Sequence, residues 1–496
     1  MTRHHPVLLG LDVGTSATKA TLAEADRRVV ASGEIAHEVD RPDERWAEQD
    51  AEGVWWQDVV KLCRQLNAGG HAPEAIAVSG MGPCVLVTDG RGRPLRPAIL
   101  YGIDTRSQAE IAELTEQLGA EQILARCGSP LTSQAVGPKL LWLRRHERAV
   151  WSRTRRVFTA HSYLVFRLTG EYVLDHHAAS QFAPLYDLEA HEWIADWAAE
   201  VAPGLELPRL AWPAEPVGGV SAVAAKETGL RQGTPVAAGT IDTRAEAVSV
   251  GVVGPGQSMI QYASTIFVLH VLDRPLRHPR LWATVGVLPA TYNLGAGMAT
   301  SGALMAWFHE LTGAGFDALA DEAASVAPGS HGLVVLPYFS GERTPLLDPN
   351  ARGVVAGLTL RHGRGHLYRA LLEGTAFAVR HNLETMAAAG AGVSELVATG
   401  GGLRTPLWPQ IVSDVTGVAQ VLPVTESGAA LGDTMLAAAA AGLAGTPPRD
   451  ALAGGRRILP RRADRARYDR LYRAYRALYS SSADVVHGLA ALQEEG

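Results

Sequence analysis

Two similar hairpin patterns, one at the start of the chain and one just past its middle, constrain the fold most. In the first, two apolar strands flank a Gly-Thr-Ser turn at residues 14–16, and in the second they flank an Ala-Ser-Thr turn at residues 263–265. The four predicted strands are Val7–Leu11, Lys19–Ala25, Gln257–Tyr262 and Ile266–Leu272. A repeated unit of this kind suggests two related halves, and a chance likeness is the alternative.

A single acid, Asp12, stands where the first strand ends beside its turn. Backbone N–H groups and hydroxyls of such a turn can hold phosphate oxygens, and a carboxylate can hold Mg²⁺ or its waters. The pattern is as typical of an ordinary hairpin with an exposed acid in its turn. From this stretch alone, both interpretations stay open.

A second acid, Asp242, follows a buried strand that ends at Gly239 and precedes a small-residue helix predicted over Ala245–Gly251. Taken alone, this position favours an N-cap, which is worth about 1 kcal/mol. A catalytic carboxylate is the alternative interpretation.

Three further stretches are candidates for ligand contacts. Met81-Gly82-Pro83-Cys84 interrupts two strands at the end of a predicted sheet, where α/β proteins bind ligands. Asp104 and Arg106 either hold a polyhydroxylated ligand, or pair with each other and cap the following helix. Gly400–Gly402 leaves room for a flat group such as an adenine ring, or forms a tight strand–helix turn.

The totals exclude several classes of protein. The chain has 496 residues, which is more than one compact core usually supports, and 47% of them are hydrophobic. A net charge of −6 without a basic block gives no reason to expect nucleic acid or an anionic membrane as a partner. Residues 1–6 are polar, so we expect neither a signal peptide nor a membrane span. The widely spaced Cys63, Cys84 and Cys127 form no metal-binding or disulfide pattern, which favours a reducing cytoplasm.

The chain resembles the FGGY carbohydrate kinases through nearly its whole length. The most specific match is the segment Gly353–Glu373, whose glycines, apolar residues and final acid have the spacing of the family signature. Leu336–Tyr338 with Gly341–Pro345 is a second match, and Pro138–Leu143 is a third, although Val136 stands where a small hydroxyl residue or proline is usual. The resemblance implies a duplicated actin-like (ribonuclease-H-like) α/β ATPase fold. We expect two domains, residues 1–243 and 244–496, with a cleft between them.

The resemblance also implies a role for each matching residue. Asp242 aligns with the general base of the family, and Asp12 with the acid of its first phosphate motif. The nucleotide contacts would be Gly14, Thr15, Ser16, Lys19, Ser264, Thr265, Gly302, Gly400, Gly401 and Gly402. In the second turn, Ala263 replaces the usual glycine. The cofactors implied are ATP and Mg²⁺, with Asp12 and Asp242 as the metal ligands.

The chemistry explains why such a kinase needs a base. A sugar hydroxyl is a poor nucleophile near neutral pH, and a positioned carboxylate that takes its proton accelerates transfer by roughly 10²–10⁴-fold. The GxxxxGK[ST] loop of P-loop enzymes does not occur in the sequence, so the hairpins and Mg²⁺ would carry the phosphates. With the resemblance included, we prefer catalysis over capping for Asp242.

Within the family, the chain looks most like the xylulokinase branch, which implies phosphorylation of a primary hydroxyl of a ketopentose, D-xylulose. Met81, Gly82, Asp104, Arg106 and Asp242 would contact the sugar. That branch has histidine after the methionine, and this chain has glycine. Another ketose or a polyol, such as ribulose, is therefore an alternative, and so is a non-catalytic sensor of sugar or nucleotide. The expected partners are sugar and ATP, and the sequence is compatible with a homodimer.

Overall fold

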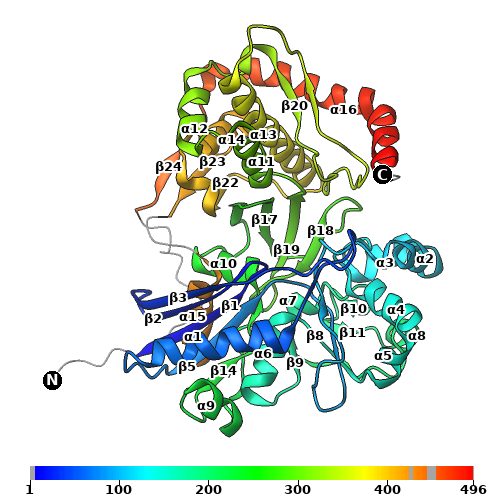
Figure 1. Ribbon diagram of the computed structural model, residues 1–496, viewed down its shortest axis with the longest axis vertical. Coiled ribbons are helices and arrows are strands. Elements are labelled where there is room, and N and C mark those ends of the chain that lie inside the picture. Colours follow the sequence, from blue (N-terminus) through cyan, green and yellow to red (C-terminus); the bar gives the residue numbers. More distant parts are fainter. Residues whose placement is uncertain (1–5, 424–427, 444–453, 495–496) are drawn as a thin grey trace, which may run out of the picture.

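Two seven-stranded sheets, one in each half of the chain, organise the computed structural model, which describes residues 6–423, 428–443 and 454–494 (Figure 1). The strands of the first sheet are β1 Val7–Val13, β2 Ala17–Glu24, β3 Val29–Ala36, β5 Ala75–Gly80, β13 Pro216–Gly219, β14 Pro235–Ala237 and β15 Thr240–Ile241. Their order is β13-β14-β5-β1-β2-β3, and β15 also pairs with β5. The central β1 is antiparallel to β2 and parallel to β5.

The second sheet repeats this plan. Its strands are β16 Ser258–Tyr262, β17 Ile266–Leu272, β18 Trp282–Val285, β19 Tyr292–Met298, β22 Glu395–Thr399, β23 Ala419–Leu422 and β24 Arg456–Ile458, in the order β18-β19-β17-β16-β22-β23-β24. The central β16 is antiparallel to β17 and parallel to β22, as β1 is to β2 and β5. The two hairpins therefore occupy equivalent places, and the predicted duplication is confirmed.

Helices and short strand pairs surround the sheets in two lobes (Figure 1). The helices of the first half are α1 Gln57–Asn67, α2 Gln108–Leu118, α3 Ala120–Cys127, α4 Val136–His146, α5 Arg148–Arg153, α6 Ala160–Thr169, α7 His176–Ala179, α8 Ala195–Val201 and α9 Ala222–Thr228. Those of the second half are α10 Asp242–Ser249, α11 Gly302–Thr312, α12 Phe316–Ser325, α13 Arg364–Ala388, α14 Leu407–Thr416, α15 Ala429–Ala440 and α16 Arg465–Glu494. The short strands are β4 Glu48–Gln49, β6 Leu86–Thr88, β7 Ala98–Ile99, β8 Arg156–Phe158, β9 Val173–Asp175, β10 Tyr186–Asp187, β11 Glu192–Trp193, β12 Arg209–Ala211, β20 Val334–Leu336 and β21 Val354–Ala356.

Helices α10 and α15 pack against each other where the two halves meet. Although α15 follows the second sheet in the sequence, it packs on β1 and β5 of the first, and Figure 1 shows it in orange within the lower lobe. Glycines permit this approach: a Cβ at Gly10 would lie 1.9 Å from the Ala430 carbonyl oxygen, and one at Gly432 would lie 1.7 Å from that of Ala245. The boundary expected between residues 243 and 244 falls inside α10.

Most predicted elements occur, and the differences lie mainly at their ends. β1 continues through Asp12 to Val13, so the acid belongs to the strand rather than to the turn. A π-helical turn over Ala51–Trp56 precedes α1. Residues 170–235 contain several short strands and helices.

Of the polar N-terminal segment noted in the sequence, residues 1–5 lie outside the described residues. In the described part of the chain, no helix is long and apolar enough to cross a membrane.

Candidate active site

Three neighbouring strand ends place the predicted acids side by side. In the parallel register of β1 and β5, Asp12 stands opposite Ser79. β15 pairs with the same end of β5, with Ile241 opposite Gly80, and Asp242 follows directly. Ligands of open α/β sheets bind outside the carboxyl ends of parallel strands, and these acids lie at such an edge.

Asp12 is a buried carboxyl group with 9% of its surface exposed. Ser79 Oγ donates a hydrogen bond to Asp12 Oδ1 over 3.1 Å, and Lys19 stands opposite Asp12 on β2. Burial raises the pKa of Asp12, whereas the Ser79 hydrogen bond and the Lys19 charge lower it. A bound cation would stabilise the ionised form of such an acid.

Asp242 is the first residue of α10, and Ile241 holds the N-cap position. Its Oδ1 accepts a hydrogen bond from the Thr243 N–H at 2.6 Å. The alternative in which Asp242 caps the helix therefore does not describe this structure. Removal from bulk water raises the pKa of Asp242, and the neighbouring Asp12 raises it further. Carboxyl groups perturbed in this way inside a cavity are typical of catalytic sites.

A cavity of about 680 Å³ brings five of the predicted site residues together. These are Asp12, Lys19, Asp242, Gly400 and Gly401. The lining also includes Glu246, Gln261, the start of α15 and residues of β2 and β3. Because the lining comes from both sheets and from the helices between them, the cavity lies where the cleft was predicted.

The first hairpin turn, Gly14–Ser16, is anchored at one residue and open at the next. Thr15 Oγ1 lies within hydrogen-bond distance of the Tyr101 hydroxyl, at 3.1 Å. Ser16 and Lys19 are exposed. The hairpin therefore offers the Ser16 hydroxyl and the Lys19 ammonium group to a ligand, while the Thr15 side chain anchors the turn.

The second turn, Ala263–Thr265, is tied to the start of α11. The Gly302 N–H donates to the Ala263 carbonyl oxygen at 3.0 Å, and a Cβ at Gly302 would lie only 2.4 Å from that oxygen. Gly302 is thus needed for the packing of the turn against the helix, independently of its predicted ribose contact. Ala263 has no positive φ, so alanine in place of the usual glycine strains no backbone there.

The three glycines after β22 were predicted either to form a tight strand–helix turn or to leave room for a flat group, and the structure supports each interpretation at different positions. Gly400 has φ +95°, and a Cβ on it would lie 2.3 Å from the Tyr262 carbonyl oxygen. A Cβ on Gly402 would lie 2.7 Å from the Trp408 ring. These two positions form a tight strand–helix turn. A Cβ on Gly401 would meet no heavy atom of the described residues within 4 Å, and this glycine lines the cavity, so it leaves open space for a ligand.

The predicted sugar loop passes between the two acids. The Met81 N–H donates to the Val13 carbonyl oxygen at 2.8 Å, which holds the loop beside the end of β1. A Cβ on Gly82 would lie 3.0 Å from Ile241 Cγ1, so the loop also touches the residue before Asp242. Met81 is 1% exposed, and neither Met81 nor Gly82 is among the residues that line the cavity.

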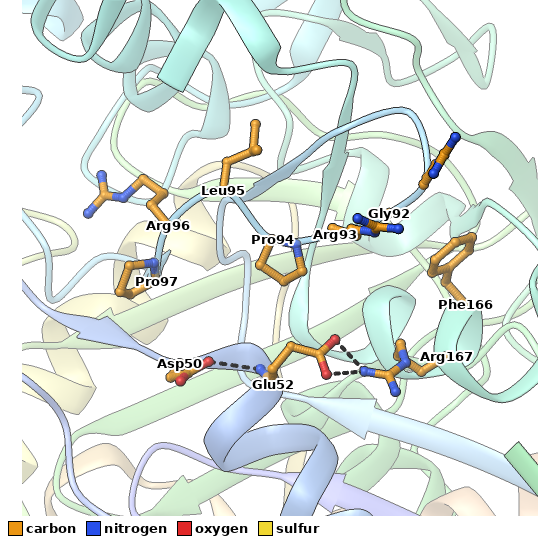
Figure 2. A pocket seen from close by; sticks show the side chains of 11 residues that line it. Asp50, Glu52, Gly92, Arg93, Pro94, Leu95, Arg96, Pro97, Phe166 and Arg167 are labelled. Carbon is orange, nitrogen blue, oxygen red and sulfur yellow. Dashed lines mark hydrogen bonds and ion pairs between the residues drawn. The ribbon is translucent and has the colours of Figure 1, made fainter. Parts of the chain in front are cut away.

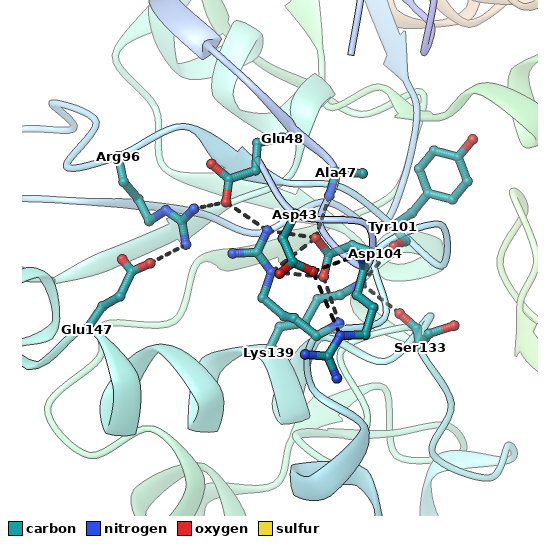
Figure 3. A network of polar contacts seen from close by, with 11 residues as sticks. Asp43, Ala47, Glu48, Arg96, Tyr101, Asp104, Ser133, Lys139 and Glu147 are labelled. Carbon is teal, nitrogen blue, oxygen red and sulfur yellow. Dashed lines mark hydrogen bonds and ion pairs between the residues drawn. The ribbon is translucent and has the colours of Figure 1, made fainter. Parts of the chain in front are cut away.

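Asp104 and Arg106 pair with each other inside the first half, and Figure 3 shows Asp104 within this network of polar contacts. Both side chains have an exposed fraction of 0%, and Arg106 also pairs with Glu48 at 2.7 Å. Asp104 accepts a hydrogen bond from the Ala47 N–H at 2.7 Å, and Ser107 holds the N-cap position of α2. The structure therefore has the mutual pairing that the sequence left open as one alternative, and the sugar contact of Asp104 and Arg106 stays a prediction.

Family models decide the classification. The N-terminal domain of the FGGY family of carbohydrate kinases matches residues 7–249, and its C-terminal domain matches residues 260–441. The chain belongs to the FGGY family of carbohydrate kinases. It is thus an ATP-dependent sugar kinase, and both the predicted family and the predicted fold are confirmed.

Relatives of this FGGY kinase cover its full length. A xylulose kinase of Lactococcus lactis is 28% identical over 99% of both chains. The solved structure of a xylulose kinase from Rhodospirillum rubrum is 33% identical and superposes with a TM-score of 0.88 over 97% of this chain and 100% of that one. A gluconokinase of Bacillus subtilis is 27% identical over 88% of each chain.

Three residues of this FGGY kinase site were not predicted. Tyr101 carries the hydroxyl beside Thr15, and Glu246 lines the cavity one helical turn after Asp242. Spacing from a predicted residue could have indicated Glu246, because residues four apart share a helix face. Asp433 is the one charged residue of the alanine-rich helix α15 and has no exposed surface. A lone acid in an alanine-rich stretch is the sequence signal that could have found it.

A second groove, of about 710 Å³, lies on the first half of the kinase and contains no predicted site residue (Figure 2). Its lining joins residues 91–97 to Asp50, Glu52, Phe166 and Arg167. Glu52 and Arg167 form an ion pair within it, and Arg96 is paired with Glu48 and Glu147. These charges already have partners, so we assign no ligand to this groove.

Proposed function

We propose that this FGGY kinase transfers the γ-phosphoryl group of ATP to a primary hydroxyl of D-xylulose, giving D-xylulose 5-phosphate. The observation that carries the proposal is the cavity in which Asp12, Lys19 and Asp242 face the turn at Gly400 and Gly401. The sugar is inferred from the relatives, because xylulose kinases match this chain over nearly its full length.

Mg²⁺ is the metal proposed for this site, with Asp12 and Asp242 to hold it directly or through waters. Carboxylate oxygens suit this hard cation. The donor set fits, because Asp12 raises the pKa of Asp242 and a divalent cation would relieve that repulsion. When bound, Mg²⁺ would neutralise charge on the β- and γ-phosphates.

Asp242 is the proposed general base. Its carboxylate takes the proton of the sugar's primary hydroxyl as that oxygen forms a bond to the γ-phosphorus. The bond from this phosphorus to the bridging oxygen breaks, and ADP leaves with the electron pair. The proton stays on Asp242 and is later released to water.

The two hairpin turns are proposed to hold the phosphates from opposite sides, and the glycine turn to hold the adenosine. The first turn would contribute Gly14, Thr15, Ser16 and Lys19, and the second Ser264 and Thr265. The exposed Ser16, Lys19 and Ser264 support this arrangement. Gly401, which has open space at its Cα, supports a flat group at the other end of the cavity.

The sugar is proposed to lie against Met81 and Gly82, beside Asp242. Gly82 supplies no imidazole for a sugar hydroxyl, and its close approach to Ile241 leaves little room for a larger residue. The gluconokinase among the relatives gives a second candidate substrate, a sugar acid, within the same reaction class.

An ADP-release assay over ketoses, polyols and gluconate tests the substrate, with D-xylulose expected to give the highest kcat/KM. Another sugar with a kcat/KM tenfold or more above that of D-xylulose would replace it in the proposal.

Asp242→Ala tests the role of Asp242 as general base and should lower kcat by about 10²–10⁴-fold with the fold retained. Activity within tenfold of the parent would exclude this role.

The non-catalytic sensor of sugar or nucleotide, which the sequence alone left as an alternative, is set aside because the chain belongs to a family of kinases and has both Asp12 and Asp242. We also retain the domain bounds 1–243 and 244–496 as a proposal. Cys63, Cys84 and Cys127 are buried and form no disulfide, which supports a reducing compartment such as the cytoplasm.

A further inference from the structure

Asp433 lies directly behind Asp12, and no step of the proposed reaction uses it. Its Oδ2 is 2.6 Å from Ser79 Oγ, and the same Ser79 oxygen is 3.1 Å from Asp12 Oδ1. Asp433 has no exposed surface, and its Oδ1 has no hydrogen-bond partner among the described residues. One serine hydroxyl therefore bridges two carboxyl groups that come from opposite halves of the chain.

Packing holds the three residues in this arrangement. Ser79 and Asp12 are register partners on the parallel strands β5 and β1. α15 lies so close to β1 that a Cβ on Gly10 would be 2.9 Å from Asp433 Cβ. The close approach of α15 to β1 thus depends on Gly10, and it brings the short side chain of Asp433 within hydrogen-bond distance of Ser79.

An acid at this place is unfavourable for stability alone. Apolar helix neighbours give Asp433 no compensating charge, and a buried carboxyl group is costly unless it is hydrogen-bonded. Burial raises the pKa of Asp433 well above its ordinary value, and Asp12 and Asp242 raise it further. Alanine, the commonest residue of α15, would fill the position without that cost.

We propose that Asp433 is a positioning residue: through the Ser79 hydroxyl it holds the Asp12 carboxylate in the orientation that faces the cavity. The hydroxyl has one hydrogen, so both bonds form at once when the protonated carboxyl group of Asp433 donates to Ser79 Oγ and Ser79 donates to Asp12 Oδ1. The first turn of α15, Gly428–Leu431 with its N-cap, lines the same cavity as Gly400 and Gly401. The helix thereby connects the nucleotide end of the cavity to the acid at its other end.

The role of Asp12 toward Mg²⁺ and phosphate rests on the proposed function, so the test includes a measurement that needs no sugar. Asp433→Ala, Asp433→Asn and Ser79→Ala are compared for binding of Mg·ADP by calorimetry and for the Mg²⁺ concentration that gives half-maximal activity. Asp433→Ala and Ser79→Ala should each weaken Mg·ADP binding by about tenfold, as removal of supports behind metal ligands does. The double variant should lose little more, because both changes break one chain of hydrogen bonds.

Asp433→Asn separates positioning from charge, because its amide can still donate to Ser79. Mg·ADP affinity within about twofold of the parent is expected. Thr434→Ala is the matched control: Thr434 is on the same helix, is 1% exposed and donates its hydroxyl within the helix, to the Leu431 carbonyl oxygen at 2.7 Å. It should leave both measurements unchanged.

Two results would overturn the proposal. One is Mg·ADP affinity and Mg²⁺ dependence within twofold of the parent in Asp433→Ala. The other is Asp433→Asn binding as weakly as Asp433→Ala. Should Asp433→Ala fail to fold, the Mg·ADP affinities of Ser79→Ala and Asp433→Asn still test the positioning role. A parent that binds Mg·ADP but phosphorylates no sugar would contradict the proposed function and leave this test intact.

Discussion

Asp12, Asp242 and Glu246 are acids whose pKa values are all raised by burial at the cavity, and this sets how the free protein responds to pH. A folded protein that holds a proton which the unfolded chain releases becomes less stable as pH rises. The acids therefore oppose folding at neutral pH until a ligand compensates their charge. This is a stability cost localised at the functional site.

Asp242→Asn should stabilise the metal-free protein increasingly from pH 5 to pH 8. The parent carboxyl has a pKa raised to about 8 in the folded state, against an ordinary value of 3.8, so the parent loses stability as pH rises between these two values. The amide is neutral throughout, so the variant does not share this loss. The measurement is the difference in Tm between variant and parent, in EDTA and without nucleotide.

Asp89→Asn provides the control for this prediction. Asp89 lies in a half-exposed turn, and hydrogen bonds from the backbone N–H groups of Arg93 and Arg91 lower its pKa. It is therefore ionised in both states across the same window, and its difference in Tm should stay flat. An Asp242→Asn difference that is equally flat would contradict the raised pKa.

The three cysteines should be unreactive in the native protein. Burial raises the pKa of Cys63, Cys84 and Cys127 to about 12, and the thiolate is the reactive form. With Ellman's reagent at pH 8, we expect less than one fast-reacting thiol before unfolding and all three thiols after addition of guanidinium chloride. A rapid native reaction at any of them would show that its burial is incomplete.

At the scale of elements, the contact between α10 and α15 depends on the absence of one side chain. Gly432→Ala would place a Cβ 1.7 Å from the Ala245 carbonyl oxygen, so the helices must separate. Overpacking of this kind typically costs about 1–3 kcal/mol, and we expect at least that loss in urea unfolding.

Gly488→Ala is the matched glycine on α16, where a Cβ would meet nothing of the described chain within 4 Å. Alanine is the better helix former, so this variant should gain about 0.5–1 kcal/mol. A Gly432→Ala protein as stable as Gly488→Ala would show that α10 and α15 are not packed as described.

The elements also show why the sequence predicted the family better than the site. The signature segment is largely structural: Glu373, at its end, accepts hydrogen bonds from Arg369, Gly329, Ser330 and Tyr468 inside the second half. Its spacing is therefore dictated by packing and could be recognised in one sequence. The pairing of Asp104 with Arg106 depends on burial, and the bridge from Asp433 to Asp12 depends on tertiary contact. The local pattern offered the pairing as one of two alternatives without deciding between them, and it gave no sign of the bridge.

At the scale of the whole molecule, the repeated hairpins suggested two related halves, and the fold itself was predicted from the resemblance to the FGGY family. The position of α15 could not be predicted, because its alanine-rich sequence indicates burial without saying against which sheet. Tertiary contacts, among them those with Gly10 and Ser79, place it on the first sheet.

Binding of sugar together with a non-hydrolysable ATP analogue should make the molecule more compact. The cavity is lined from both halves, and closure around the ligands would exclude water from the γ-phosphate. Small-angle X-ray scattering should show a smaller radius of gyration with both ligands than with either alone. An unchanged radius would mean that the two lobes stay fixed during the reaction.

The position of α15 has a consequence for biosynthesis. Leu8 and Ala77 of the first sheet pack against Met435 and Leu436 of this helix. During synthesis, α15 cannot cover this face of the first sheet until residue 440 has left the ribosome. The face therefore stays exposed to solvent while the second half is being made. The first sheet is thus buried only after a helix near the C-terminal end of the chain has been made. A chain truncated between its halves would leave an apolar surface exposed and would be prone to aggregation.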